Sequence, residues 1–221
     1  MNKNFNWYES YYKKISIAGQ DGSLGNKLHH LPLEKGYSKN SFFRNVLELG
    51  GGEGEHIPHI KHDFENWTIL DIRELILDIK DPRITYVQAD AHNLPYEDSV
   101  FDRVVITCLL HHAESPWQIL DEARRVLKDA GTLEILLPTD PSIFYKTAQF
   151  LTTGIRALKS GVYKLSRTVH SFEHRNHYSS LSNMINFIFE RDEIKITFTP
   201  FFIRVSFLNL FAVYRIKIRK V

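Results

Sequence analysis

The sequence predicts an α/β fold built on a doubly wound, mostly parallel sheet, and three observations support this class. A short apolar strand at residues 45–49 runs directly into a glycine-rich turn, as strands do at the ligand-binding edge of such sheets. Two further apolar strands end on acids, Asp71 and Asp90. The strand expected at residues 103–107 is nearly all β-branched, which is typical of a strand buried on both faces. Helical patterns separate the later strands, as a wound sheet requires.

The amino-acid composition limits the classes of function that this chain can have. The chain has 221 residues, of which 43% are hydrophobic and 24% charged, enough for a substantial core. A net charge of +2 is too small to indicate a nucleic acid partner. The single cysteine, Cys108, cannot form an internal disulfide, which favours a reducing, cytoplasmic location. The first residues lack the apolar core of a signal peptide, and Pro200 and Arg204 interrupt the most apolar tract, so we expect no membrane span.

The glycine-rich turn is the most informative stretch. Its acid and glycines follow the pattern E-x-G-x-G-x-G and are Glu48, Gly50, Gly51, Gly52 and Gly54. Glycine adopts positive φ without steric cost and lets backbone N–H groups approach a ligand closely. The dinucleotide fingerprint G-x-G-x-x-G would need a glycine where Glu55 stands. The turn therefore predicts a site for a nucleoside cofactor, and a purely structural turn is the alternative.

An acid lies where a nucleoside ribose is expected. The strand at residues 67–70 ends on Asp71, which follows Glu48 by 71 − 48 = 23 residues. In α/β folds that bind nucleosides, an acid at the end of the second strand accepts hydrogen bonds from the ribose hydroxyls. Asp71 is the candidate for this role, and a solvent-exposed acid at a strand end is the alternative.

These features together resemble the class I S-adenosylmethionine-dependent methyltransferases, in particular the small-molecule, type 11 domain. Over about residues 45–139 the resemblance also includes Asp90-Ala91, Leu94-Pro95-Tyr96, Phe101-Asp102 and Leu110-His111-His112. It implies a seven-stranded sheet of order 3-2-1-4-5-7-6, the last strand antiparallel, with helices on both faces. It also implies S-adenosyl-L-methionine as the cofactor. The cofactor-binding candidates are Glu48, Gly50, Gly51, Gly52, Gly54, Asp71, Ile72, Asp90, Ala91 and Thr107.

The catalytic candidates are His112 and His111, which follow the strand at 103–107. Members of the family that methylate bases or glutamine carry an Asn/Asp-Pro-Pro-aromatic motif at this place, whereas the Leu-His-His sequence is similar to that of small-molecule members. A free imidazole has a pKa near 6.5 and is mostly the neutral base at pH 7. His112 is the preferred general base, and hydrogen bonding within the loop is the alternative role.

The segment 141–178 carries a strong basic excess. Its cations are Lys146, Arg156, Lys159, Lys164, Arg167 and Arg175. This excess predicts a lid over an anionic acceptor, and a solvated basic helix face is the alternative. Apolar residues at helical spacing from Phe144 to Leu158 indicate a lid helix with Asp140 as its N-cap and Pro141 at its first position.

Two segments carry weaker expectations. Residues 1–44 should form an N-terminal cap, followed by a methyltransferase domain at 45–221 with the lid at about 141–178. Weak candidates for acceptor contacts are Tyr8, Tyr12, His174, His177 and Tyr178. A helix is expected to begin within residues 55–62, with His56, His59 and His62 solvated. No metal site is expected, because the chain has neither H-E-x-x-H nor a cysteine pair.

The sequence therefore predicts methyl transfer from S-adenosylmethionine to a small acceptor that is anionic or linked to a sugar or lipid. Two other functions stay open. A nicotinamide-dependent oxidoreductase would share Gly50, Gly52 and Asp71. A non-catalytic S-adenosylmethionine-binding protein is the other, and Glu53 in the glycine turn is the feature that favours it. The acceptor atom and the oligomeric state are not determined by the sequence.

Overall fold

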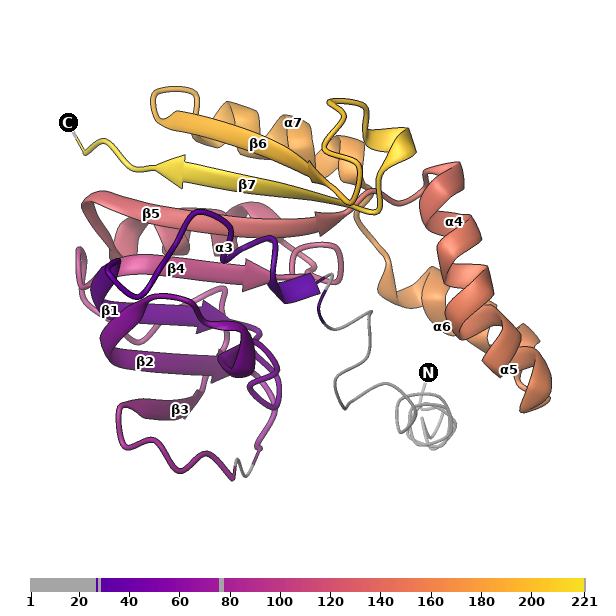
Figure 1. Cartoon of the computed structure of the whole chain (residues 1–221), viewed down its shortest axis with the longest axis horizontal. Coiled ribbons are helices and arrows are strands. Elements are labelled where there is room, and N and C mark those ends of the chain that lie inside the picture. The colour runs from indigo at the N-terminus through magenta and orange to yellow at the C-terminus, as the bar shows by residue number, and fades with distance from the viewer. Residues whose placement is uncertain (1–26, 28, 76–77, 221) are drawn as a thin grey trace.

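A seven-stranded sheet of order β3-β2-β1-β4-β5-β7-β6 organises the computed structural model, which describes residues 27, 29–75 and 78–220 (Figure 1). The strands are β1 (Phe42–Leu49), β2 (Asp63–Asp71), β3 (Ile84–Gln88), β4 (Phe101–Thr107), β5 (Leu127–Pro138), β6 (Glu193–Thr199) and β7 (Phe211–Lys217). The first five strands in this order pair in parallel, and β7 is antiparallel to both its neighbours. The predicted fold class and strand order are confirmed.

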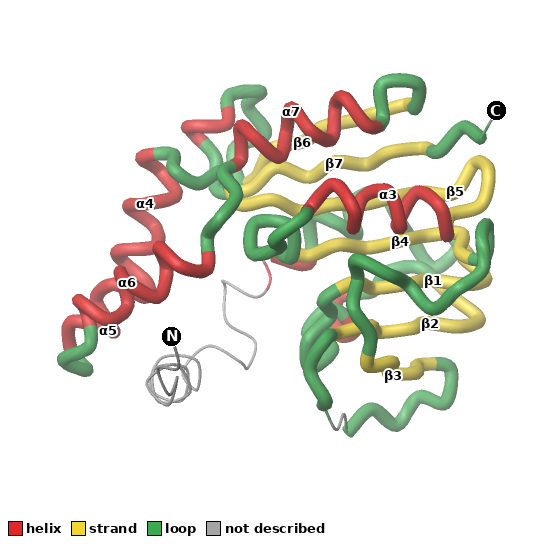
Figure 2. The backbone as a smooth tube through the Cα atoms, turned by 180° about the vertical axis from the view of Figure 1, so that it is seen from behind, coloured by secondary structure: helices red, strands yellow, loops and turns green. Residues whose placement is uncertain are grey.

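Two helices, α3 (Pro116–Val126) and α7 (Tyr178–Ile188), cover one face of the sheet, as the view from behind shows (Figure 2). The apolar side of α3 is fully buried against this face, with Ile119, Leu120 and Ala123 at its centre. Alternate residues of the central strands point to the same face, because side chains alternate along a strand. This layer is the larger core of the protein.

The opposite face departs from the prediction. After the glycine turn the chain forms turns and the short 3-10 helix η1 (Ile57–His59), then enters β2 at Asp63. The helix expected within residues 55–62 is therefore absent. The expectation that His56 and His62 are solvated is also wrong, because both side chains are buried. Their burial fixes the path of the chain here, and Pro58, which has no N–H to donate, is confined to the first turn of η1.

A buried ion network holds residues 29–41 over this face. Arg103 of β4 is completely buried and donates to Glu34, 2.7 Å away, and to Glu134 of β5 through Nε at 2.6 Å. The other carboxylate oxygen of Glu134 accepts from Nε of Arg215 on β7 at 2.5 Å. Tyr37 lies against both guanidinium groups. Two carboxylates thus balance two guanidinium groups in the interior, which is the condition for burying such charges without a large penalty.

Buried histidines extend this network. His62 accepts a hydrogen bond from Arg103 at Nε2 and donates from Nδ1 to the carbonyl of Asp63 at 2.9 Å. Burial, and then the charge of Arg103, lower the pKa of His62. His56 donates from Nε2 to Glu34 at 3.0 Å, while its Nδ1 faces Nδ1 of His30 at 3.1 Å. Because burial lowers the pKa of His30 to about 3, the ring of His30 joins the network without adding charge.

An arm of helices projects from the end of the sheet (Figure 1). It consists of α4 (Ile143–Gln149), the π-helical turn η2 (Phe150–Gly154), α5 (Ile155–Lys159) and α6 (Tyr163–Glu173). A helix therefore forms where the lid helix was predicted, but its N-cap is Ser142, whose hydroxyl accepts from the Tyr145 N–H at 3.1 Å. Asp140 does not cap the helix, because its carboxylate faces His170 and His174 instead.

The remaining short element is the 3-10 helix η3 (Ser206–Leu208), between β6 and β7. Within the described ranges 27, 29–75 and 78–220, no helix combines the length and apolarity needed to cross a membrane.

The first prediction tests the buried network. Arg103→Ala should lower the free energy of unfolding by about 3–5 kcal/mol, because Glu34 would stay buried without its counter-charge and Glu134 would keep only Arg215. Urea denaturation measures this loss. The matched control is Arg44→Ala, which removes the solvent-exposed pair with Glu65 and should change stability little. Similar losses in the two variants would show that the network does not hold the sheet together.

Candidate functional site

The glycine turn lies at the carboxyl end of β1 and needs its glycines. The alternate residues Gly50, Gly52 and Gly54 have φ values of 67°, 54° and 82°. Residues that carry a side chain rarely adopt this region of φ. Gly51 is required for another reason, since a Cβ there would lie 2.7 Å from the side chain of Ile69. The turn thus keeps backbone close to whatever occupies its open side.

Glu48 supports the turn from beneath. Its side chain is buried, and its Oε2 accepts a hydrogen bond from the indole N–H of Trp67 at 3.1 Å. A Cβ at Gly51 would come within 2.9 Å of this carboxyl group, so the two are in contact. Burial raises the pKa of Glu48 to about 7. The structure therefore places this acid under the loop, where it determines the shape of the turn.

Asp71 faces the turn from the carboxyl end of β2. Its carboxylate accepts the backbone N–H of Gly52 at 3.0 Å, which joins the second strand to the turn. Arg73 donates to both oxygens, from Nε and from Nη2, each at 3.0 Å. Burial alone would raise the pKa of Asp71, but the hydrogen bonds from Arg73 outweigh it and hold the pKa below its usual value. Arg73 was not predicted as a site residue, although it stands two residues after Asp71 in the sequence.

The sheet register brings the other cofactor candidates to the same edge. Leu49 pairs with Leu70 and Ile106, and Asp71 pairs with Gln88, so the loops that follow these strands meet. Ile72 exposes 66% of its surface there, an apolar side chain beside a polar turn. At the end of β4, the hydroxyl of Thr107 is buried and has no hydrogen-bond partner in the described ranges.

The strand that precedes Asp90 ends at this edge too. The Asp90 carboxylate accepts the backbone N–H of His92 at 2.9 Å and lies 2.6 Å from its Nδ1. Ala91 is buried. Asp90 is therefore held in a fixed orientation by its own loop.

The predicted catalytic histidines lie together beyond β4, and the arm brings a third to them. The ring centroids of His111 and His112 are 3.8 Å apart, and that of His174 is 4.5 Å from His111 and 5.3 Å from His112. His111 is buried, and His112 is exposed. Burial, followed by the neighbouring His112 and His174, lowers the pKa of His111 to about 2. His111 thus stays neutral at physiological pH.

The end of the arm fixes this loop through backbone contacts. The N–H of Arg175 donates to the carbonyl of His111 at 3.0 Å, and the side-chain amide of Asn176 donates to the carbonyls of Leu110 and Ala113 at 3.0 and 2.7 Å. No local pattern in the sequence indicated Asn176. These contacts position the histidine loop relative to the arm.

The other acceptor candidates are dispersed. His177 is the exposed N-cap residue of α7. The hydroxyl of Tyr178 lies 3.3 Å from that of Tyr214, on the side of the larger core. Tyr8 and Tyr12 lie outside the described residues.

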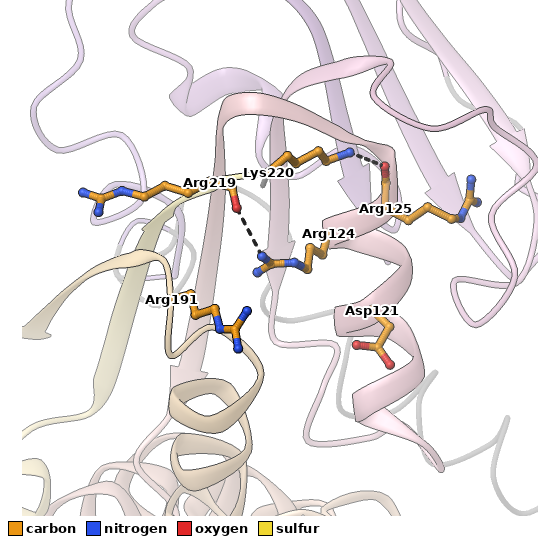
Figure 3. A pocket seen from close by; sticks show the side chains of 6 residues that line it. All are labelled: Asp121, Arg124, Arg125, Arg191, Arg219 and Lys220. Atoms are coloured by element: carbon orange, nitrogen blue, oxygen red, sulfur yellow. Dashed lines mark hydrogen bonds between the residues drawn. The ribbon is translucent and has the colours of Figure 1, made fainter.

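A basic pocket of about 450 Å³ lies elsewhere on the molecule (Figure 3). Its lining residues are Asp121, Arg124, Arg125, Arg191, Arg219 and Lys220. Figure 3 shows Arg124 donating to the carbonyl of Arg219, and Lys220 donating to that of Arg125. The pocket lies at the end of α3, near the start of β5. This is the opposite end of the parallel strands from the glycine turn, so the pocket is separate from the candidate site.

The second prediction concerns Glu48 and pH. Below about pH 4.5 the residue is protonated in both states, whereas between pH 4.5 and 7 only the unfolded chain loses the proton. The wild type therefore loses stability as pH rises through this window, and Glu48→Gln should not. Between pH 5 and pH 8 the difference in free energy of unfolding should shift by roughly 2–3 kcal/mol in favour of the variant. Urea denaturation at both pH values measures it, and a difference that does not change with pH would contradict the assignment.

Comparison with known proteins supports the interpretation of the turn. Residues 47–135 match the sequence model of a family described as a methyltransferase domain. A demethylmenaquinone methyltransferase of Clavibacter sepedonicus is 31% identical over 104 residues, 44% of this chain and 42% of that protein. One of Thermotoga maritima is 30% identical over 128 residues, 56% of this chain and 53% of that protein. The chain thus matches about half the length of these curated relatives.

Solved structures share the whole architecture. The plantazolicin methyltransferase BpumL, solved with a substrate analogue and S-adenosylhomocysteine, superimposes with a TM-score of 0.63 at 16% identity, covering 96% of this chain and 93% of that one. An S-adenosylmethionine-dependent methyltransferase of Thermotoga maritima gives a TM-score of 0.54 at 20% identity, covering 97% and 95%. At these low sequence identities, the similarity to the two structures shows only that the fold is shared.

The strand order, the glycine turn and the sequence match therefore agree. The antiparallel β7 and the acid at the end of β2 complete the set of features that the turn led us to expect. Residues 47–135 are thus similar to the methyltransferase domain family, and the described chain has the fold of solved S-adenosylmethionine-dependent methyltransferases.

Proposed function

We propose that this protein transfers a methyl group from S-adenosylmethionine to a small-molecule acceptor. The observation that carries the proposal is the glycine turn, whose glycines lie at positive φ and which faces Asp71 across the carboxyl edge of the sheet. When bound, the cofactor supplies an electrophilic methyl group on a sulfonium. The task of the protein is then to orient that methyl group toward a nucleophile and to keep water away from both.

The residues at this edge suit the cofactor. The backbone of the turn can lie close to the amino acid end of the cofactor, because Gly50 and Gly52 carry no side chain and lie at positive φ. Exposed Ile72 offers an apolar surface to the adenine, and Asp90 lies beyond it on the next loop. The hydroxyl of Thr107, buried and without a partner in the described chain, can bond a polar group of the ligand.

Arg73 regulates access to the ribose acceptor. Both oxygens of Asp71 already accept from its guanidinium group, so the ribose hydroxyls must displace it to reach the carboxylate. The Arg73 side chain is 59% exposed and can swing into solvent at small cost, whereas the bond from Gly52 to Asp71 is buried and stays. We therefore assign Asp71 as the ribose ligand and Arg73 as its competitor.

His112 is the proposed general base. It is the exposed member of the histidine loop, whereas His111 is buried and held neutral. Removal of a proton from an acceptor hydroxyl or ammonium group requires such a base near the transferred methyl. His174 packs beside both rings and completes the wall of the acceptor site.

The arm supports an acceptor that is anionic or lipid-linked. It carries exposed cations, among them Lys146, Lys159 and Arg167. Large apolar side chains of the arm also face solvent, namely Ile143, Phe144, Phe150, Leu151, Leu158 and Phe172. A surface of this kind suits a partly apolar ligand with a negative group. The names of the two curated relatives, demethylmenaquinone methyltransferases, make a quinone the first acceptor to test.

The third prediction separates Asp71 from Arg73. Asp71→Ala should weaken binding of S-adenosylhomocysteine by about 10- to 100-fold, because hydrogen bonds to a charged group contribute roughly 1.5–3 kcal/mol. Arg73→Ala should tighten binding by up to about fivefold, since it removes a competitor held by an exposed ion pair. Isothermal titration calorimetry measures both. Weaker binding in Arg73→Ala would instead make Arg73 a ligand of the cofactor, and unchanged binding in Asp71→Ala would remove Asp71 from the site.

The fourth prediction tests transfer itself. With labelled S-adenosylmethionine and demethylmenaquinone chemically reduced to its hydroquinone in detergent micelles, or a panel of anionic and neutral acceptors, the wild type should produce methylated product. His112→Ala should lower kcat by roughly 10²- to 10⁴-fold and leave S-adenosylhomocysteine affinity nearly unchanged. His59→Ala, on the other face of the sheet, is the control. For an anionic acceptor, KM should rise with salt.

The results also discriminate between the alternatives. Binding of S-adenosylhomocysteine without transfer to any acceptor would favour a non-catalytic binding protein. Binding of a nicotinamide cofactor in its place would favour an oxidoreductase. Full turnover in His112→Ala would mean that the reaction needs no base at this position.

A further inference from the structure

Three side chains at the root of the arm converge on one point. Asp140 follows β5. His170 lies in the last turn of α6 and His174 is its C-cap residue, four positions further on, so both lie on one side of that helix. Oδ2 of Asp140 is 3.4 Å from Nε2 of His170 and 3.3 Å from Nδ1 of His174. One ligand atom from each residue lies within 4.8 Å of the other two. The arm and the sheet are therefore joined through three groups that all bind metals.

The distances fit a metal ion. With bonds of about 2.0–2.1 Å, a tetrahedral zinc ion holds neighbouring ligand atoms roughly 3.3–3.4 Å apart. Two imidazoles and one carboxylate are a known protein donor set for zinc, with the fourth position left for a substrate or water. The Asp140 and His174 side chains are only 8% and 13% exposed, so the point is largely shielded from solvent.

The surroundings point to a ligand independently. Buried His111 leaves Nδ1 without a hydrogen-bond partner among residues 27, 29–75 and 78–220, although its ring lies 4.5 Å from that of His174. His111, His112 and His174 form a second triple with ligand atoms within 4.8 Å. A buried imidazole nitrogen without a partner costs free energy that a nearby cation would recover.

An outer contact can hold one ligand in the right form. The side-chain amide of Gln149 lies 3.0 Å from Nδ1 of His170, the nitrogen that faces away from Asp140. If the amide presents its oxygen, Nδ1–H donates to it and Nε2 carries a lone pair toward the cluster. Metal-binding histidines usually donate their second N–H in this way.

We propose that Asp140, His170 and His174 bind a divalent transition-metal ion, with Zn²⁺ the best match to the donor set and His111 beside it. The site replaces the expectation from the sequence that the chain has no metal site. The metal site is inferred from the geometry of these side chains and does not depend on the proposed function. Its role rests on the proposed function: next to the histidine loop, the ion's open position would bind an oxygen of the acceptor and hold it beside the transferred methyl.

The experiment uses the full chain without an affinity tag, treated with a chelator and then titrated with Zn²⁺ by calorimetry and with Co²⁺ by visible absorption. We expect one ion per chain and the intense bands of four-coordinate Co²⁺. Asp140→Asn keeps the shape of the side chain. Asp140→Asn and His170→Ala should each weaken Zn²⁺ binding by more than roughly 100-fold. Gln149→Ala should weaken it by about 10- to 100-fold. His59→Ala, a histidine outside the cluster, should bind as the wild type does.

Thermal unfolding and S-adenosylhomocysteine binding are measured on the same samples. Retained cofactor binding in Asp140→Asn and His170→Ala shows that these variants are folded. Absence of stoichiometric Zn²⁺ and Co²⁺ binding by the wild type would overturn the metal site, and so would equal losses in His59→Ala. Metal binding by a protein that does not bind S-adenosylhomocysteine would support the site and contradict the proposed function instead.

Discussion

The ion network around Arg103 is the constraint on which the arrangement of this protein depends. A guanidinium group buried in the middle of a sheet would be prohibitively costly alone, so Glu34 and Glu134 must both reach it. Glu34 belongs to the segment before β1, and Glu134 to β5. The ion pair between Arg103 of β4 and Glu34 therefore holds residues 29–41 over one face of the sheet. A helix would otherwise cover that face. Hydrogen bonds from Arg103 and Arg215 to the carbonyl of Leu33 hold the same segment.

This arrangement changes the edge of the sheet where the cofactor is proposed to bind. Because His56 is drawn into the interior by Glu34, the chain after the glycine turn forms only η1 before entering β2. The turn is then held by its own glycines, by buried Glu48 below and by Asp71 at the side. Glycine adopts the positive φ values of the turn without steric cost, and these packed and hydrogen-bonded neighbours fix its conformation.

The arm of helices is attached beside the histidine loop. Its root is fixed to the sheet by Asp140 and by the backbone contacts of Arg175 and Asn176 with the histidine loop. Its outer part is joined internally by a small cluster around Ala157 and Val169 and exposes both cations and apolar side chains. The arm thus combines a rigid attachment beside the histidines with an outer surface that suits an amphipathic ligand.

The sequence by itself determined the strands, the edge at which they end and the glycine turn, because these depend on local patterns, whereas the strand order was expected only from the resemblance to the methyltransferases. Alternation in strands, helical spacing in α3 and glycines at positive φ are all encoded within short stretches. The tertiary structure alone decided the burial of His56 and His62, the pairing of Asp71 with Arg73 and the convergence of Asp140 with His170 and His174. Each of these features depends on which side chains come into contact in the folded chain. A buried charge is stable only opposite its partner, and the partner of Arg103 lies 69 positions earlier, at Glu34 (103 − 34 = 69).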